Sequence, residues 1–465
     1  MNNNKNIHFE VSERKVLLKL FDVVFVLVSL FVISSVFNFK YFTFSASNYY
    51  WILVLALYLN IFGSVFEMYN LQIASNQSQI IKSIILTTST TVLFYLLTPI
   101  YTPELPSNRL QIVFFYGAIL LALLLWRIFY VNFLASHRFE KNVVLVCDKG
   151  QLVELIKDIE KADPHYKIVG YVSSEGEDKI KGIKSKSIKY INPIDLKHFV
   201  LTHSISEILI ASQKTEIITV SLYNQLIHLL ENGFIIREYS QAYELITQRI
   251  PVHYVSRDFY RYFPFSRSNQ NHLYLLATRI ADIIFSLIGL SFGLLFFPII
   301  LIGNVIGNKG NLIYTQERVG KNGIVFKIYK YRTMIENAEV NGAVFTSVND
   351  VRITPFGKFL RKTRLDEFPQ FINILKGDMS IIGPRPERPV FVNEIAEVMP
   401  FYETRHVIKP GLTGWAQVNY SYGDSIDDSL VKLQYDLYYI KHRSIFLDIN
   451  IIIKTISTVL FYRGQ

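Results

Sequence analysis

The sequence is poor in cysteine and in charged residues. It contains one cysteine, Cys147, so an intrachain disulfide is excluded and the soluble parts of the chain need no oxidising compartment. Asp, Glu, Lys and Arg make up 18% of its 465 residues, whereas hydrophobic residues make up 50% and aromatic residues 14%. This balance argues against a purely soluble enzyme and is typical of a membrane protein with soluble parts.

Acidic residues are also outnumbered. There are 38 Asp and Glu against 48 Lys and Arg, which gives a formal net charge of +10. A basic excess is compatible with nucleic acid, anionic lipid or a phosphorylated substrate as a partner. The polar N-terminal stretch "MNNNKNIHFEVSERK" lacks a small-residue cleavage site. The apolar run that follows is therefore expected to be a retained membrane anchor and not a cleaved signal peptide.

Four apolar runs lie before residue 140, and each is close to the length of about 20 residues that a bilayer core requires. They cover residues 18–37, 50–66, 83–101 and 110–130. Asp22 lies near the start of the first run and is expected either to reach the interface or to face the interior of a helical bundle. Lys and Arg precede the first run and follow the last. Both ends are therefore expected in the cytosol, which four spans allow.

Residues 141–250 have a different pattern. The stretch "NVVLVCDKGQLVELIKDIEK" predicts a buried strand, a turn and an amphipathic helix, and "YKIVGYV", "SEILIAS" and "FIIREYS" predict further strands. Strands that alternate with helices predict a parallel α/β sheet. The first strand–helix turn, "CDKGQL", has one glycine and lacks the G-x-G-x-x-G pattern of dinucleotide sites. A structural or oligomerising module is favoured, with a retained ligand site as the alternative.

A fifth apolar run follows, with no charged residue between Asp282 and Lys309. Length alone predicts a fifth transmembrane helix. However, Arg279 precedes the run and several Lys and Arg follow it, so both flanks are basic. Pro298 also interrupts the run, and proline removes a helix hydrogen bond. These observations favour a re-entrant helix over residues 273–306 that enters and leaves on the cytosolic side.

Two basic residues end a predicted strand. After the turn "VGKNG", strict alternation places four side chains on one face: Phe326, Ile328, Lys330 and Arg332. Lys330 and Arg332 would project together from the end of that face, as in a phosphate clamp. A solvated basic edge strand explains the same pattern, and spacing alone favours that second interpretation.

Two adjacent acids, Asp366 and Glu367, accompany a predicted short helix. The helix is predicted to begin near Asp366 from four apolar residues at helical spacing: Leu365, Phe368, Ile372 and Leu375. Spacing alone favours acids that complement the positive end of the helix dipole. The alternative is a carboxylate nucleophile with a partner. Adjacent helical residues diverge by about 100°, so one acid would attack or bind metal and the other would bind the metal, a base or a cation.

Rigid turns follow. In "GDMSIIGPRPERP", Arg385 stands between Pro384 and Pro386, which present it at low entropic cost. "KPGLTGWAQVN" predicts another rigid turn, whose Trp415 either stacks on a base or packs internally. The last apolar run, "SIFLDINIIIKTISTVLFY", predicts an amphipathic helix at a membrane interface.

Together these segments resemble the bacterial sugar transferases, the monotopic polyprenyl-phosphate phosphoglycosyl transferases. The resemblance covers residues 273–465 and rests on motifs in the family's order: "QERVGKNG", "KYRTM", "RLDEFPQ", "LKGDMSIIGPRPE", "KPGLTGWAQVN" and "YDLYYIKHRSIFLDINIIIKT". A series of ordered motifs is specific where each motif alone is weak. Residues 1–272 resemble the large subclass, which initiates exopolysaccharide and capsule synthesis and is similar to undecaprenyl-phosphate glucose phosphotransferase.

The resemblance implies a reaction. Sugar-1-phosphate passes from a UDP-sugar, with glucose expected, to undecaprenyl phosphate, and UMP is released with Mg²⁺ as cofactor. The implied mechanism is ping-pong, with a phosphosugar ester on Asp366, while Glu367 supports Asp366 or the metal. Both acids are expected metal ligands. The alternatives are galactose or an N-acetylated amino sugar as the transferred group, or a non-catalytic membrane scaffold for polysaccharide assembly.

The resemblance also assigns further residues. Contacts to phosphate or nucleotide are expected from Lys330, Arg332, Arg361, Pro384, Arg385 and Pro386. The re-entrant helix is expected to carry Arg279, Asp282 and Pro298. Two departures from the family pattern are Phe297, where serine is frequent, and "DEFPQ" in place of "DELPQ".

The predicted architecture is a membrane protein in three parts. A four-helix transmembrane bundle (1–140) precedes a Rossmann-like, CoA-binding-like α/β domain (141–250). After a linker (251–272) comes an α/β catalytic domain (273–465), anchored by the re-entrant helix. The expected partners are a UDP-sugar, undecaprenyl phosphate and the lipid bilayer, with no nucleic acid and a homodimer left open. The expected location is the bacterial cytoplasmic membrane, with the catalytic domain on its cytosolic face.

Overall fold

The chain forms two compact units in the computed structural model, Met1–Thr247 and Gln248–Gln465. The structure describes residues 11–37, 39–69, 77–131, 141–163, 166–173, 188–211, 219–252, 271–308, 310–336, 338, 350–399, 401–420 and 426–460. The predicted linker at 251–272 lies outside the described residues except for two residues at each end.

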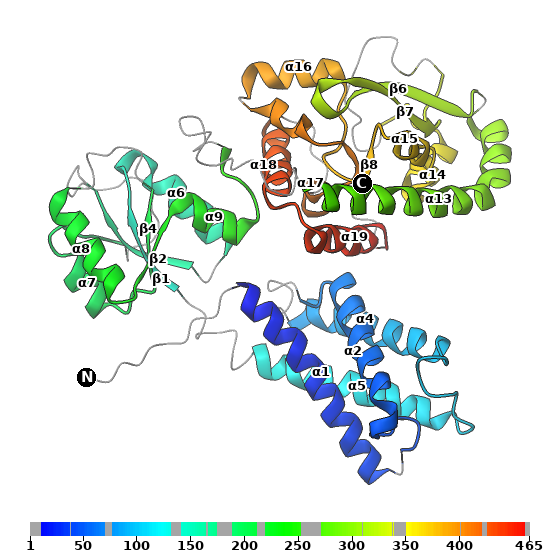
Figure 1. Cartoon of the computed structure of the whole chain (residues 1–465), viewed down its shortest axis with the longest axis horizontal. Helices are drawn as coiled ribbons and strands as arrows, with labels where there is room; N and C mark the ends of the chain where they lie inside the picture. The colour runs from blue at the N-terminus through cyan, green and yellow to red at the C-terminus, as the bar shows by residue number, and fades with distance from the viewer. Residues whose placement is uncertain are drawn as a thin grey trace. The chain divides into compact units, whose positions relative to one another are not determined.

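Four long apolar helices come first in the chain (Figure 1). They are α1 (Val11–Val36), α2 (Tyr49–Val65), α4 (Gln77–Leu97) and α5 (Leu110–Phe129), with a short turn, η1 (Ala46–Asn48), before α2. Each belongs to a segment long and apolar enough to cross a membrane. Asp22 of α1 faces the interior, where its Oδ2 lies 2.7 Å from Nη2 of Arg127 on α5 and both side chains are buried. A buried charge needs such a partner in an apolar surrounding, so the pair ties α1 to α5.

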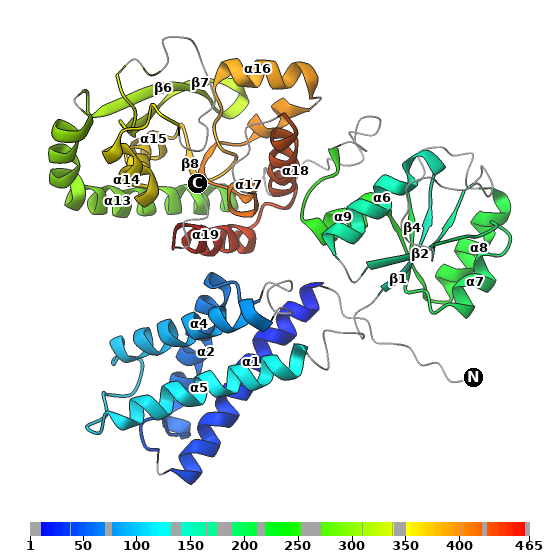
Figure 2. The ribbon, with the colours of Figure 1, turned by 180° about the vertical axis from the view of Figure 1, so that it is seen from behind.

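The predicted parallel α/β sheet is confirmed. Its strands are β1 (Lys141–Val146), β2 (Tyr166–Val172), β3 (Lys189–Tyr190), β4 (Glu207–Ile210) and β5 (Ile235–Glu238), in the order β3-β2-β1-β4-β5 and all parallel. The helices are α6 (Lys149–Ala162), α7 (Leu196–Thr202), α8 (Val220–Glu231) and α9 (Tyr239–Thr247). Figures 1 and 2 show α6 and α9 on one face of the sheet and α7 and α8 on the other. Both faces are thus covered, as a parallel sheet requires.

The second unit contains the fifth apolar segment. Helix α13 (His272–Gly303) includes Pro298 and continues into a π-helical turn, η4 (Asn304–Asn308). The last part of this segment turns away from the direction of the preceding helix (Figures 1 and 2). By length and composition the segment could also cross a membrane.

The rest of the second unit is a mixed α/β fold of short elements. An antiparallel hairpin, β6 (Ile313–Val319) and β7 (Val325–Tyr331), turns at η5 (Lys321–Gly323). Helix α14 (Pro355–Thr363), the 3-10 turn η6 (Leu365–Glu367) and α15 (Gln370–Lys376) follow. Strand β8 (Ser380–Ile382) pairs in parallel with β9 (Gly411–Thr413). The remaining elements are α16 (Pro389–Val398), η7 (Tyr402–Val407), α17 (Trp415–Asn419), α18 (Ile426–His442) and α19 (Ile445–Leu460).

Helix α13 is fixed to this fold by two charged residues. The Arg279 guanidinium donates to the carbonyls of Ile374 (2.6 Å) and Leu375 (2.7 Å), at the C-terminal end of α15. Asp282 Oδ1 accepts from the Ser380 hydroxyl (2.9 Å) and the Ile381 N–H (2.8 Å) at β8. The two residues expected to mark the re-entrant helix therefore hold that helix against the protein.

Two glycines let α13 approach closely. A Cβ on Gly289 would lie 2.4 Å from the ring of Phe371, and one on Gly293 would lie 2.8 Å from the ring of Phe368. These glycines are four residues apart and so share one face of the helix. That face receives the two aromatic rings that follow the Asp-Glu pair in the chain.

The prediction that a helical segment begins near Asp366 is confirmed. Arg364 adopts a left-handed backbone conformation (φ 60°) that ends α14, and the 3-10 turn η6 begins at the next residue, Leu365. Phe368 and Pro369 keep the right-handed helical conformation and lead into α15 at Gln370. The predicted apolar face is confirmed only at its start: Leu365 and Phe368 pack in one core cluster, whereas Ile372 is 41% exposed and Asn373 is fully buried. Asn373 accepts from the Tyr329 N–H (3.0 Å) and donates to the Lys327 carbonyl, so it pairs α15 with β7. The polar side chain faces inward because it completes backbone hydrogen bonds that would otherwise be buried and unmade.

Candidate active site

A cavity of about 1360 Å³ lies in the second unit. Six of the residues predicted from the sequence line this cavity: Lys330, Arg332, Arg361, Asp366, Glu367 and Arg385. Pro386 lines a small adjoining recess that shares Arg385 and Lys330. The structure thus brings together residues from β7, α14, η6 and the loop after β8, which are up to 55 positions apart in the sequence.

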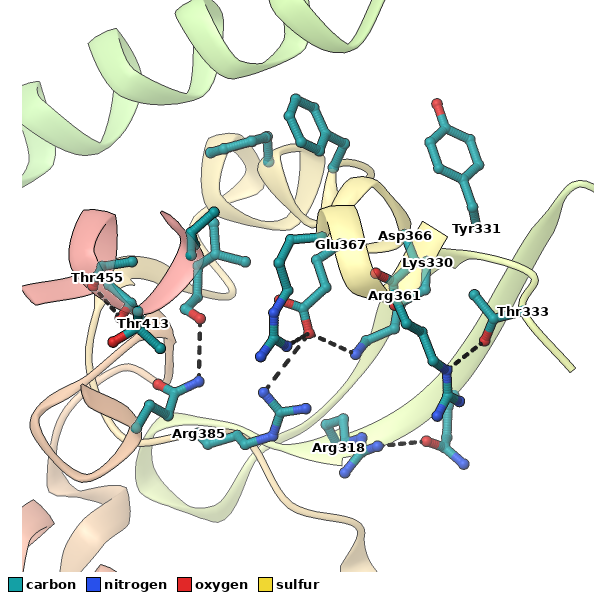
Figure 3. A pocket seen from close by; sticks show the side chains of 18 of the residues that line it. Arg318, Lys330, Tyr331, Thr333, Arg361, Asp366, Glu367, Arg385, Thr413 and Thr455 are labelled. Carbon is teal, nitrogen blue, oxygen red and sulfur yellow. Dashed lines mark hydrogen bonds and ion pairs between the residues drawn. The ribbon is translucent and has the colours of Figure 1, made fainter. Parts of the chain in front are cut away.

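Glu367 lies at the centre of a cationic cluster (Figure 3). Its Oε1 accepts from Lys330 Nζ at 3.2 Å and lies 3.7 Å from Arg385 Nη1 and 4.0 Å from Arg364 Nη1. Burial raises the pKa of this carboxyl, but Lys330, Arg385 and Arg364 outweigh burial and hold the pKa below its ordinary value. Glu367 is therefore an ionised anchor that collects three cations beside Asp366.

Asp366 has the opposite environment. It is 7% exposed, and its Oδ1 is buried with no hydrogen-bond partner among the described residues. Burial and the neighbouring Glu367 raise the pKa of this carboxyl above its ordinary value, against the pull of Lys330 and Arg361. A desolvated carboxylate without hydrogen-bond donors is a stronger nucleophile and a better cation ligand than a solvated one.

A second group of cations lies on the wall formed by β7 and α14. Arg361 Nε donates to the Thr333 hydroxyl at 3.0 Å, as Figure 3 shows. Arg332 Nε donates to the Asn311 carbonyl at 2.8 Å. Lys358 and Lys362 of α14 line the same cavity. Asp366 therefore lies between two cationic regions, one around Arg385 and the other around Arg361.

The backbone of the Pro-Arg-Pro loop, residues 384–386, is fixed by residues that no sequence motif indicated. Nη2 of Arg405 donates to the Arg385 carbonyl (3.0 Å) and to Asp436 Oδ2 (2.8 Å), and its Nη1 donates to the Tyr402 hydroxyl. The Arg405 and Asp436 side chains are both buried. At the start of the loop, the Pro384 carbonyl accepts from the Gly411 N–H at 2.8 Å. The backbone of the loop is thus fixed while the Arg385 side chain extends into the cavity.

Apolar residues complete the cavity. Phe285, Ile288 and Phe292 line it from α13, and Ile452 and Ile456 line it from α19. The same cavity therefore offers cations for phosphate groups and apolar surface from the two most apolar helices of the unit. Such a combination fits an amphiphile with an anionic head.

The acids fit a divalent cation only in part. Among the described residues, no group of three or more His, Cys, Asp and Glu is placed to hold a metal. The unpartnered Oδ1 of Asp366 has unused acceptor capacity, whereas Oε1 of Glu367 already meets three cations. Mg²⁺ is commonly held by one or two carboxylates together with substrate phosphates and water. Asp366 suits that mode, and the expected role of Glu367 as a ligand would need its other oxygen.

The family model described as "Bacterial sugar transferase" matches residues 273–462. Among known proteins, a Bacillus subtilis (strain 168) protein described as a candidate undecaprenyl-phosphate N-acetylgalactosaminyl 1-phosphate transferase is 46% identical over 153 residues. That alignment covers 86% of the relative and 32% of this chain. The chain belongs to the bacterial sugar transferase family.

Longer proteins match this chain over the same region. The UDP-N-acetylgalactosamine-undecaprenyl-phosphate N-acetylgalactosaminephosphotransferase of Aeromonas hydrophila is 44% identical over 191 residues, which are 40% of this chain and 44% of the relative. The UDP-glucose:undecaprenyl-phosphate glucose-1-phosphate transferase of Klebsiella pneumoniae is 37% identical over 198 residues, 42% of each chain. The match thus spans less than half the length of these two relatives.

Proposed function

We propose that this sugar transferase moves sugar-1-phosphate from a UDP-sugar to undecaprenyl phosphate and releases UMP. The observation that carries the proposal is the placement of Asp366. Its carboxylate is buried, one of its oxygens is unpartnered, and it lies between two cationic regions of a cavity that also has apolar walls. The names of the similar proteins, which pair undecaprenyl phosphate with UDP-sugars, support this assignment of substrates.

The proposed chemistry has two displacements. A carboxylate oxygen of Asp366 attacks the sugar-linked phosphorus, the P–O bond to the uridylyl phosphate breaks, and UMP leaves with the bonding electrons. A phosphate oxygen of undecaprenyl phosphate then attacks the same phosphorus and restores the Asp366 carboxylate. The cations around Glu367 and Arg361 neutralise the phosphate oxygens, which otherwise repel an anionic nucleophile. Division into two steps lets one site serve two anionic substrates in turn.

A divalent cation, Mg²⁺ as the expected species, is part of the proposal. When bound, it would supply positive charge that stabilises the charge developing on the substrate phosphate groups. Asp366 Oδ1 is the protein atom best suited to contribute to its coordination, since it has no partner among the described residues.

Glucose and an N-acetylated amino sugar are the transferred sugars favoured here, with galactose as a third candidate. The large subclass that the sequence resembles predicts glucose. The two relatives with 44% and 46% identity, however, carry N-acetylgalactosamine in their names, whereas the glucose transferase of Klebsiella pneumoniae is 37% identical. We therefore place UDP-N-acetylgalactosamine beside UDP-glucose as a donor.

The membrane arrangement is also proposed. Four spans would leave both flanks of the helical bundle in the cytosol, and α13 would enter and leave on that side. Asp366 would then meet a cytosolic nucleotide sugar and a lipid phosphate at the inner headgroup layer. The apolar cavity walls from α13 and α19 support an acceptor with an apolar tail.

The test is UMP release by the purified protein with undecaprenyl phosphate, Mg²⁺ and each UDP-sugar in turn. One donor should give lipid-dependent UMP and a lipid-linked sugar diphosphate. Asp366→Asn should reduce turnover by several orders of magnitude, because the covalent path is lost. A substantial rate in that variant would exclude Asp366 as the nucleophile, and no UMP with any donor would refute the activity.

A further inference from the structure

A chain of buried polar residues connects the end of the apolar segment with the cavity. Its members are Asn304, Asn308, Thr333 and Thr354, all of them buried. Asn304 and Asn308 belong to the π-helical turn η4 that continues α13, whereas Thr354 precedes α14 and Thr333 follows β7. Buried polar side chains need hydrogen-bond partners, and a network in which they are satisfied makes the segments that it joins rigid.

The hydrogen bonds of these residues converge on the backbone of Arg332 and Thr333. Asn308 Nδ2 donates to the Arg332 carbonyl at 2.7 Å and to Asn304 Oδ1 at 3.3 Å. The Thr354 hydroxyl donates to Asn308 Oδ1 and accepts from the Gly357 N–H at 2.9 Å. The Thr354 N–H donates to the Thr333 carbonyl at 3.1 Å. The backbone that carries Arg332 and Thr333 is thus held by η4 from one side and by the start of α14 from the other.

The chain of contacts ends on a cavity cation. The Thr333 hydroxyl accepts from Arg361 Nε at 3.0 Å, and Arg361 lowers the pKa of Asp366 electrostatically. There is little free space at this junction, since a Cβ on Gly357 would lie 2.0 Å from the Thr333 carbonyl oxygen. A shift of the Thr333 backbone would therefore displace both the first turn of α14 and the acceptor that orients Arg361.

We propose that Asn308, Thr354 and Thr333 are positioning residues that hold Arg361 in its phosphate-binding orientation. The anion affinity beside Asp366 then depends on how the η4 end of the apolar segment is docked. This inference rests on the proposed function and deepens it. A phosphate group is the ligand chemistry; it belongs to either the UDP-sugar or undecaprenyl phosphate, and separate titrations distinguish the two.

The direct test compares hydroxyl-deleting variants of similar shape. Thr333→Val and Thr354→Val should raise KM for one substrate roughly 5- to 30-fold, the effect of one or two lost hydrogen bonds. That substrate should be the one whose KM rises in Arg361→Ala. Thr354→Ser keeps the hydroxyl and should restore most of the affinity. Thr363→Val is the matched control, because its hydroxyl bonds only to carbonyls of its own helix in the described structure and should leave KM unchanged.

A double-mutant cycle separates positioning from general loss of stability. In an Arg361→Ala background, Thr333→Val should add less than a twofold change in KM, because the side chain that it positions is gone. An equal effect in both backgrounds would overturn the proposal. Since Thr354 also caps α14, the cycle with Thr333→Val is the decisive one.

A binding measurement keeps the inference separable from the transferase assignment. Inorganic pyrophosphate, titrated against the full-length protein in detergent, should raise the melting temperature of the wild type and of Thr363→Val more than that of Thr333→Val. This result without any UMP release would refute the transfer reaction and support the positioning role. UMP release with equal pyrophosphate responses and equal KM values in all variants would support the transfer reaction and refute the positioning role.

Discussion

Asp366 and Glu367 are neighbours in the chain, yet their carboxylates meet opposite surroundings. Glu367 Oε1 lies within 4.0 Å of nitrogen atoms from Lys330, Arg364 and Arg385. Asp366 Oδ1 is buried without a hydrogen-bond partner among the described residues. Because Asp366 and Glu367 lie on a tight 3-10 turn, their side chains diverge and face different parts of the cavity wall. One carboxylate is stabilised as an anion, whereas burial and the neighbouring Glu367 disfavour the charged form of the other.

The two acids should therefore have opposite effects on stability. Asp366→Asn should raise the melting temperature at neutral pH by a few degrees, since about 1 kcal/mol corresponds to about 2–4 °C for a domain of this size. Glu367→Gln should lower it by a similar amount, because three cations lose their counter-charge. Thermal unfolding of the purified proteins from low to neutral pH measures both.

The pH dependence follows from the direction of each pKa shift. The pKa of Asp366 is raised, so the wild type loses stability as pH rises from the ordinary aspartate value through the raised one, and the gain in Asp366→Asn should vanish at low pH. The pKa of Glu367 is lowered, so its contribution is present above the ordinary glutamate value and is lost as pH falls through the lowered one. Effects of the same sign for both variants would contradict this division of roles.

Arg385 should contribute to binding of the nucleotide sugar more than to binding of the lipid. A hydrogen bond to a charged group is worth about 1.5–3 kcal/mol, so Arg385→Ala should reduce kcat/KM for the UDP-sugar by roughly ten- to a hundredfold. The KM for undecaprenyl phosphate should change little. Steady-state kinetics with each substrate varied in turn measures both effects. An unchanged kcat/KM for the UDP-sugar would count against a role of Arg385 in binding the nucleotide sugar.

The Arg405–Asp436 pair should separate loop positioning from stability. Arg405→Leu leaves the buried Asp436 without its cation, which should cost about 3–5 kcal/mol of stability. The double variant Arg405→Leu/Asp436→Leu removes both charges and should recover most of that loss. Its KM for the UDP-sugar should stay raised, because the Arg385 carbonyl still lacks the donor at 3.0 Å. Full recovery of KM in the double variant would show that Arg405 does not position the loop.

Local patterns in the sequence predicted the elements that depend on local physics. Long apolar runs gave helices, and alternating strands and helices gave a parallel sheet, since length and periodicity are local properties. The burial of Asn373 was missed because its side chain bonds to the backbone of β7, a distant contact that no local periodicity signals. Arg405 and Asp436 were missed because they are 31 positions apart and no short motif links them. The cluster around Glu367 likewise joins residues from three separate segments.

The second unit should need more than the family-matched region to fold well. Ile250 is fully buried within it, its N–H donates to the Gln434 carbonyl at 3.1 Å, and Trp415 Nε1 donates to the Gln248 carbonyl at 3.1 Å. A chain that begins at Gln248 should thus melt several degrees above one that begins at His272. The Bacillus subtilis relative consists mostly of the matched region. The chain that begins at Gln248 contains all of that region, so it should keep UMP release in detergent. Equal melting temperatures would mean that residues 248–252 add nothing.

The path of α13 can be decided by labelling on both of its sides. Single cysteines at His272→Cys and Asn311→Cys, in a Cys147→Ala background, lie at exposed positions that flank the apolar segment. A re-entrant helix keeps both in the cytosol, so both should resist a membrane-impermeant thiol reagent in intact cells and react once the membrane is opened. Pro298→Leu restores an N–H to the helix and should favour a straight, spanning form. In that variant, activity should fall in proportion to the fraction of Asn311→Cys that becomes accessible from outside, because Asp366 leaves the cytosolic side together with it. External labelling of Asn311→Cys with Pro298 intact would instead establish a fifth span, and it would place the cavity where cytosolic nucleotide sugars do not reach.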